Sequence, residues 1–178
     1  MRTNPLRKGT SPGDVLGIMN DLIERANICH ERLVARKEPG AIVSALVSNV
    51  VQMLAALNEA LCALEELCPY VKAIRTEFDH DLSMWIGFRH DAAHVVDRML
   101  RPSPPGIHEA TRIEGQSGNA YMVLGYEAIS GEVRGGDNFS IRLSLRDAIS
   151  RARSLFEVTS AAVHANDYVV APGSDPES

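Results

Sequence analysis

The sequence predicts a mainly α protein, in which an antiparallel helical bundle carries a small antiparallel β-hairpin or meander and a final helix. Apolar residues recur at steps of three and four through several long segments, which is the spacing of one helix face. The clearest alternation with a period of two covers residues 139–144 and indicates a strand. Aromatic residues make up 5% of the chain, while alanine, leucine and valine are abundant. This composition favours helices over a β-sandwich.

The 178 residues of the chain are enough for one domain with a buried core. We expect a flexible arm at residues 1–10, a single domain at residues 11–170 and a flexible tail at residues 171–178. The expected parts of this domain are a helical bundle, antiparallel strands and a C-terminal helix, at residues 11–100, 107–144 and 145–166.

The first helix is expected to begin after Ser11. This serine is a preferred N-cap, Pro12 suits the first helical position, and Asp14 comes close to the free amides of the first turn. Apolar residues then continue at alternating steps of four and three to about Lys37. The pair Pro39-Gly40 predicts a break before the next helix.

Residues 41–68 carry the most regular apolar pattern, with steps of four and three from Val43 to Cys68. Because residues 41–58 contain no charged side chain, a membrane span has to be considered. Polar side chains line the other side of this helix, however, and acidic residues beginning with Glu59 follow within it. We therefore expect the central helix of a bundle and no membrane span.

Two further helices are expected, a short one at residues 69–78 and a longer one at residues 81–100. Pro69 can open the short helix, and acidic residues at positions 79 and 81 can cap the longer one. The proline-rich run at residues 101–106 ends the longer helix. Its apolar face is formed by Trp85, Phe88, Ala92, Val95 and Met99.

The chain changes character after Gly106, where short strands and glycine turns replace the helical pattern. Turns are expected at residues 115–118 and 131–136. Ser144 and Asp147 resemble a capping box and predict the start of the last helix. The expected strands are residues 107–114, 120–129 and 138–144.

Charge and cysteine content exclude several classes of protein. The formal net charge of −5 gives no overall attraction to nucleic acid or to an anionic membrane, so RNA contacts would need local clusters. Arg142 and Arg146 near the last helix could form such a cluster or simply a solvated face. The N-terminus has no apolar signal segment, which predicts a cytoplasmic protein. The three unpatterned cysteines predict reduced thiols rather than disulfides or a zinc site, at Cys29, Cys62 and Cys68.

The helix expected at residues 81–100 also has a polar face. His90, His94 and Asp97 lie on the side opposite its apolar stripe, and Arg89 lies at the edge of that stripe, roughly 60° from its centre. Imidazole can accept or donate a proton near neutral pH, and guanidinium carries a fixed charge with a fork of donors that fits phosphate. These side chains share a face that the helix does not need for its own core, and they are candidates for function unless Arg89 bonds a neighbouring helix and the histidines are ordinary solvated residues.

The run Arg89-His90-Asp91-Ala92-Ala93-His94 resembles the Arg-x4-His signature of the HEPN superfamily of small helical-bundle proteins. The resemblance covers about residues 12–100. It implies RNA cleavage without metal or cofactor, in which His94 acts on the ribose 2′-hydroxyl and Arg89 holds the scissile phosphate. It also implies that His90 or Asp91 orients the reacting groups and that two subunits share one cleft. A toxin or defence component with a cognate antitoxin or regulatory protein would fit this family.

Two alternatives remain open. Many members of the family have lost activity, so Arg89 and His94 could belong to a catalytically inactive binding or assembly module. His90 and His94 also lie one turn apart and could bind a divalent ion with Asp97. That metal site would need a further ligand, for which the candidates are His30 and His80.

Overall fold

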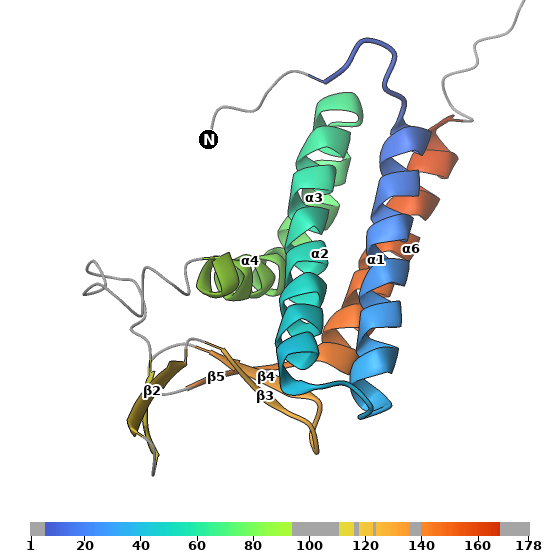
Figure 1. Ribbon diagram of the computed structural model, residues 1–178. Coiled ribbons are helices and arrows are strands. Elements are labelled where there is room, and N and C mark those ends of the chain that lie inside the picture. Colours follow the sequence, from blue (N-terminus) through green and yellow to red (C-terminus); the bar gives the residue numbers. More distant parts are fainter. Residues whose placement is uncertain (1–5, 94–110, 116–117, 123, 136–139, 168–178) are drawn as a thin grey trace, which may run out of the picture.

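The computed structural model describes residues 6–93, 111–115, 118–122, 124–135 and 140–167. Within these ranges the chain is mainly helical, with five helices, one two-stranded hairpin and one three-stranded antiparallel sheet (Figure 1). The predicted class, a mainly α protein with a small β-meander and a C-terminal helix, is confirmed.

Helix α1 covers Pro12–Val34 and begins with the predicted capping box. The hydroxyl of Ser11 accepts a hydrogen bond from the amide of Asp14 at 3.2 Å, and the Asp14 carboxylate accepts one from the Ser11 amide at 2.8 Å. The two side chains thus satisfy amides that the first turn leaves without partners. The helix ends three residues before the predicted Lys37. Arg36 adopts a left-handed conformation, with φ of 53°, which a continuing helix does not allow.

Helix α2, Gly40–Leu67, is the central element of the bundle. It runs beside α1 and also contacts α3, α4 and the C-terminal helix (Figure 1). Leu54 and Leu57 are completely buried. By length and composition alone α2 could also cross a membrane, a test that core helices of soluble proteins pass as well. Its buried residues are Leu46, Val47, Val50, Val51, Leu54, Ala55, Leu57, Ala60, Leu61 and Leu64.

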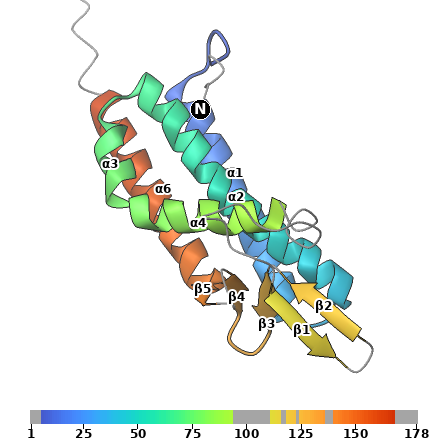
Figure 2. The same ribbon diagram turned by 90° about the vertical axis from the view of Figure 1, so that its left-hand side faces the viewer.

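Helices α3, Val71–Glu77, and α4, Asp79–Ala93, follow each other with only Phe78 between them. Helix α4 lies across the bundle rather than along it (Figures 1 and 2). Helix α4 begins at Asp79, two residues earlier than predicted, and its first turn contains Asp79 and Asp81. The predicted apolar face is confirmed at Trp85 and Phe88, which are buried, while Ala92 is half-buried. Residues 94–100 of the predicted helix lie outside the described residues.

The strands differ from the prediction in two places. The expected strand at residues 120–129 is wrong, since it is divided into β2, Gly118–Met122, and β3, Gly125–Glu127. The expected turn at residues 131–136 is also wrong, because it contains β4, Glu132–Gly135. Among the described residues of this range, only Gly131 belongs to the turn, with φ of 71°, while Val133 is buried. The closely spaced glycines favoured a turn in the sequence pattern, whereas the segment forms a four-residue strand with one buried apolar side chain.

The five strands form two antiparallel units. Strand β1, Thr111–Gly115, pairs with β2, and strands β3, β4 and β5 form a meander in which β5 covers Ile141–Ser144. Val133 lies opposite both Tyr126 and Leu143 in the registers of the meander. Residues 107–110 and 138–139 of the predicted strands lie outside the described residues.

Helix α6, Leu145–Asp167, follows β5 directly and packs against α1, α2 and α3. The hydroxyl of Ser144 accepts a hydrogen bond from the Asp147 amide at 3.2 Å, which is half of the predicted capping box. Arg151 ties this helix to the start of α4. Its guanidinium donates to Asp81 at 2.9 Å and 3.1 Å and lies 4.5 Å from the centre of the Phe78 ring.

Candidate functional site

Helix α4 places Arg89 at the surface of the bundle. The side chains of Leu82, Trp85 and Phe88 are buried and hold one face of the helix against the core. Arg89 follows Phe88 directly and therefore points away from that face, with 44% of its side chain exposed. The predicted position of Arg89 at the edge of the apolar stripe agrees with this exposure.

The guanidinium of Arg89 contacts helix α2. Its Nη1 donates a hydrogen bond to Oε1 of Glu59 at 2.9 Å, and 55% of the Glu59 side chain is exposed. An ion pair between groups this exposed contributes about 0–1 kcal/mol to stability. The contact therefore orients Arg89 without being needed to hold α4 in place, which the buried side chains of that helix already do.

The other candidate catalytic residues are only partly described. His90 is exposed on α4, next to Arg89. The backbone of Asp91 is helical, whereas its side chain and the whole of His94 and Asp97 lie outside the described residues. The structure thus gives the surroundings of the phosphate-binding candidate and leaves the acid–base candidate as a prediction.

Metal binding receives no support from the part of the chain that the structure describes. No group of three or more His, Cys, Asp or Glu side chains that could hold a metal ion occurs there. Of the two suggested additional ligands, His80 is exposed on α4 and His30 is half-buried on α1. Burial lowers the pKa of His30, and the positive charge of Arg146 lowers it further against the opposing effect of Glu31.

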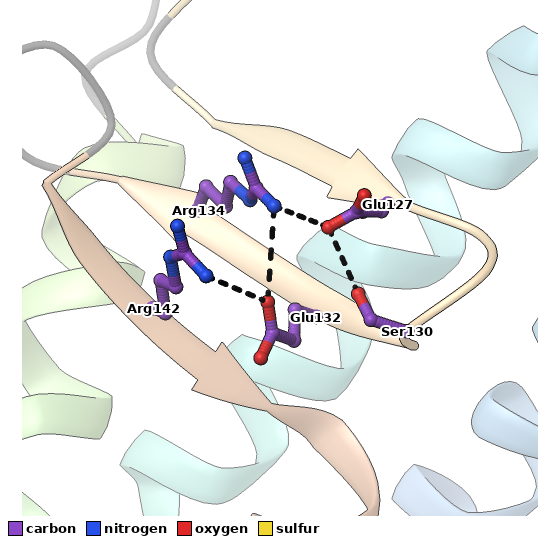
Figure 3. Close-up of polar contacts among 5 residues, drawn as sticks. All are labelled: Glu127, Ser130, Glu132, Arg134 and Arg142. Atoms are coloured by element: carbon purple, nitrogen blue, oxygen red, sulfur yellow. Dashed lines mark hydrogen bonds and ion pairs between the residues drawn. The ribbon is translucent and has the colours of Figure 1, made fainter.

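Arg142, a predicted RNA contact, belongs to a network of charges on one face of the meander (Figure 3). The residues directly opposite each other carry like charges, since Glu127 faces Glu132 and Arg134 faces Arg142. The attractive contacts run diagonally or along one strand. Arg134 contacts both Glu127 and Glu132, the latter at 4.0 Å, and Arg142 lies 3.9 Å from Glu132.

The charges of this network cancel, because two arginines stand beside two glutamates. Like charges directly opposite in a sheet destabilise it, and the diagonal contacts offset that cost. Ser130 adds a hydrogen bond of 3.0 Å to Glu127 (Figure 3). Arg142 therefore belongs to a set of charges that balance one another, and its contact with RNA stays a prediction. Arg146 is exposed in the first turn of α6 and close enough to His30 to affect its pKa.

The three cysteines agree with the prediction of free thiols. Cys68 is buried, Cys29 and Cys62 are half-buried, and none of the three forms a disulfide. Burial raises the pKa of the Cys29 thiol, with a smaller opposing effect of Arg32. This thiol is thus less reactive than an exposed one at neutral pH.

Sequence reasoning missed Glu59 as a partner of Arg89. The two residues are 30 positions apart and meet only because α4 crosses α2 at this point. The available signal was weak: Glu59 is the first charged residue after the uncharged stretch of residues 41–58. Such a residue is equally compatible with a solvated helix face.

Comparison with known proteins gives no assignment. No protein-family model, curated protein or solved structure matches the chain. Only the chemistry of the α4 face and of its neighbours therefore bears on function.

Proposed function

We propose that this protein is a metal-independent endoribonuclease of the HEPN type, in which Arg89 binds the scissile phosphate and His94 moves protons. The observation that carries the proposal is the state of Arg89, a half-exposed guanidinium at the surface of a helical bundle with one end-on carboxylate partner. A structural arginine would normally use more of its donors inside the fold. Within the described part of the chain, Arg89 gives a single donor, Nη1, to a protein acceptor, and its other donors could bind an anion.

The division of roles follows from the chemistry of the side chains. Guanidinium stays charged and offers paired donors to phosphate oxygens, whereas imidazole can take the proton of a 2′-hydroxyl or return one to the leaving oxygen. His94 is the general base or acid in this mechanism, and His90 or Asp91 orients the reacting groups. Cleavage then leaves a 2′,3′-cyclic phosphate.

The proposal includes a homodimer whose two copies bring their motifs into one cleft. Arg89 and His94 are five residues apart on the same segment, so one helix alone would direct them about 140° apart. Ile86 supports an interface here, because it is a large apolar side chain exposed on α4 one turn before Arg89 and His90. Light scattering should give a dimer at tens of micromolar protein, and a monomer would contradict the shared cleft.

A toxin or defence role would add an antitoxin or regulatory protein as a further partner.

The test is cleavage of single-stranded and structured RNA by the purified protein in EDTA, with analysis of the product ends. We expect cyclic phosphate ends, and a rate that falls about a hundred- to ten-thousand-fold in His94→Ala. Arg89→Ala and Arg89→Lys should both be impaired, since lysine keeps the charge and loses the fork of donors. Arg25→Ala is the matched control, because Arg25 is exposed on α1 in an ion pair with Asp21.

Each alternative has its own outcome. Cleavage that needs a divalent ion would favour a metal site at His90 and His94. Cleavage that survives both Arg89→Ala and His94→Ala would contradict the proposed site.

A second candidate function is a catalytically inactive binding or assembly module. The observation that favours it is the same ion pair, since Arg89 already links α4 to α2 through Glu59. The discriminating variant is His94→Gln, whose amide can still form hydrogen bonds but cannot transfer protons. Partner binding retained in a variant that cleaves no RNA would favour the module over the nuclease.

A further inference from the structure

The contact between Arg89 and Glu59 differs in geometry from the ion pairs of Arg32, Arg75 and Arg151. Arg32 and Arg151 each direct both Nε and Nη2 at a single carboxylate oxygen, and Arg75 directs Nε at Glu65 at 2.8 Å. Arg89 donates to Glu59 through Nη1, its one hydrogen bond among the residues that the structure describes. Among the described residues, its Nε–Nη2 edge therefore has no protein acceptor.

That edge is one of the two with which arginine can bind phosphate or carboxylate through two parallel hydrogen bonds. A carboxylate on Nη1 fixes the plane of the guanidinium and leaves the edge open for an incoming anion. Glu59 is suited to this task because α2 is rigid at this point, where the neighbouring residues Ala60 and Leu61 are buried in the core.

We propose that Glu59 is a positioning residue for Arg89: it holds Nη1 and presents the Nε–Nη2 edge of the guanidinium to an RNA phosphate. This inference rests on the proposed function, because it takes Arg89 as the phosphate-binding group. Glu59 itself touches neither the phosphate nor the ribose. Its negative charge opposes phosphate binding only weakly, since both side chains are exposed to water and salt.

The experiment measures the affinity for a fluorescein-labelled, 2′-O-methylated oligouridylate in EDTA, by fluorescence anisotropy. This strand offers phosphates but no 2′-hydroxyl, so binding is separated from cleavage. The variants are Glu59→Ala, Glu59→Gln, Arg89→Ala and the double variant Glu59→Ala/Arg89→Ala. Glu65→Ala is the matched control, because Glu65 lies on the same helix in an ion pair with Arg75 that also reaches a neighbouring helix.

We expect Glu59→Ala to weaken binding by up to about fivefold, the limit for an exposed ion pair. Glu59→Gln should bind nearly as well as the parent, because the amide oxygen still accepts a hydrogen bond from Nη1. The double variant should bind no worse than Arg89→Ala, since Glu59 acts through Arg89. Glu65→Ala should bind like the parent.

Other results would overturn the inference in distinguishable ways. Tighter binding by both Glu59→Ala and Glu59→Gln would mean that Glu59 competes with the phosphate. Unchanged binding in Glu59→Ala, with a loss in Arg89→Ala, would refute the positioning role and leave the proposed function intact. Unchanged binding in Arg89→Ala would refute both.

Discussion

The helical bundle and the β-meander bury apolar surface on different scales. Helix α2 alone has ten buried residues and packs against four other helices, α1, α3, α4 and α6. In β4 and β5 the buried apolar side chains are Val133 and Leu143. The meander also joins the bundle through specific polar contacts, including a hydrogen bond of 2.8 Å from Arg36 to the carbonyl of Ala128. The bundle is therefore stable by redundancy, whereas the meander depends on a few residues.

The largest expected effect is in the bundle. Replacing Leu57 by Ala removes a completely buried side chain and should lower the free energy of unfolding by about 2–5 kcal/mol. Urea unfolding followed by the fluorescence of Trp85, the single and completely buried tryptophan, measures this loss. Ile28→Ala is the control, since Ile28 is exposed on α1 and its loss should change stability by no more than about 0.5 kcal/mol. Equal stability of the two variants would contradict the assigned core.

The same contrast explains how much of the fold could be predicted. The apolar face of α2 repeats over about seven turns, so one irregular position does not hide the helix. Strand β4 has four residues and a single buried apolar side chain between Gly131 and Gly135, so local chemistry indicated a turn. Hydrogen bonds to β3 and β5 hold this segment as a strand, although its local sequence favours a turn.

The candidate site also has one part that the sequence predicts and another that depends on the packing of distant segments. The exposure of Arg89 follows from its place beside the apolar stripe of its own helix, which the sequence shows. Its partner Glu59 depends on where α4 crosses α2, and helix crossing is set by packing between distant segments. The charge network of the meander could not be predicted for a similar reason. The ion pair between Glu132 and Arg142 forms only in the register that β4 and β5 adopt.

The next effect concerns the meander. Val133→Ala removes two buried methyl groups and should cost about 1.5 kcal/mol. Because the meander depends on few contacts, the loss should open it locally and leave the bundle closed. Hydrogen exchange should accelerate for the amides of β3, β4 and β5 and stay nearly unchanged for those of α2. Equal acceleration in α2 would show that the two regions unfold as one unit.

A smaller effect is expected at Arg36, where the bundle meets the meander. Both Arg36→Ala and Arg36→Gly lose the hydrogen bond to Ala128, but only glycine adopts the left-handed backbone without strain. Arg36→Gly should therefore be more stable than Arg36→Ala by about 1 kcal/mol. Thermal melts of the pair give the difference. If alanine were the more stable replacement, the left-handed conformation at this junction would be wrong.

The smallest effect lies at the start of α1, far along the chain from the meander. The amide of Ser11 donates a hydrogen bond to the Asp14 carboxylate and is the main cause of the lowered pKa of that group, with the Ser11 hydroxyl second. A carboxyl whose pKa is lower in the folded state stabilises the protein above the pKa of the unfolded chain. This contribution is lost as the pH falls below about 4 and through the folded value. The neutral variant Asp14→Asn lacks it at every pH, so the parent should be slightly more stable near neutral pH and the two should converge in acid. Urea unfolding of both proteins across this range measures the convergence, and a constant difference would mean that the capping carboxylate has no part in the acid sensitivity of the bundle.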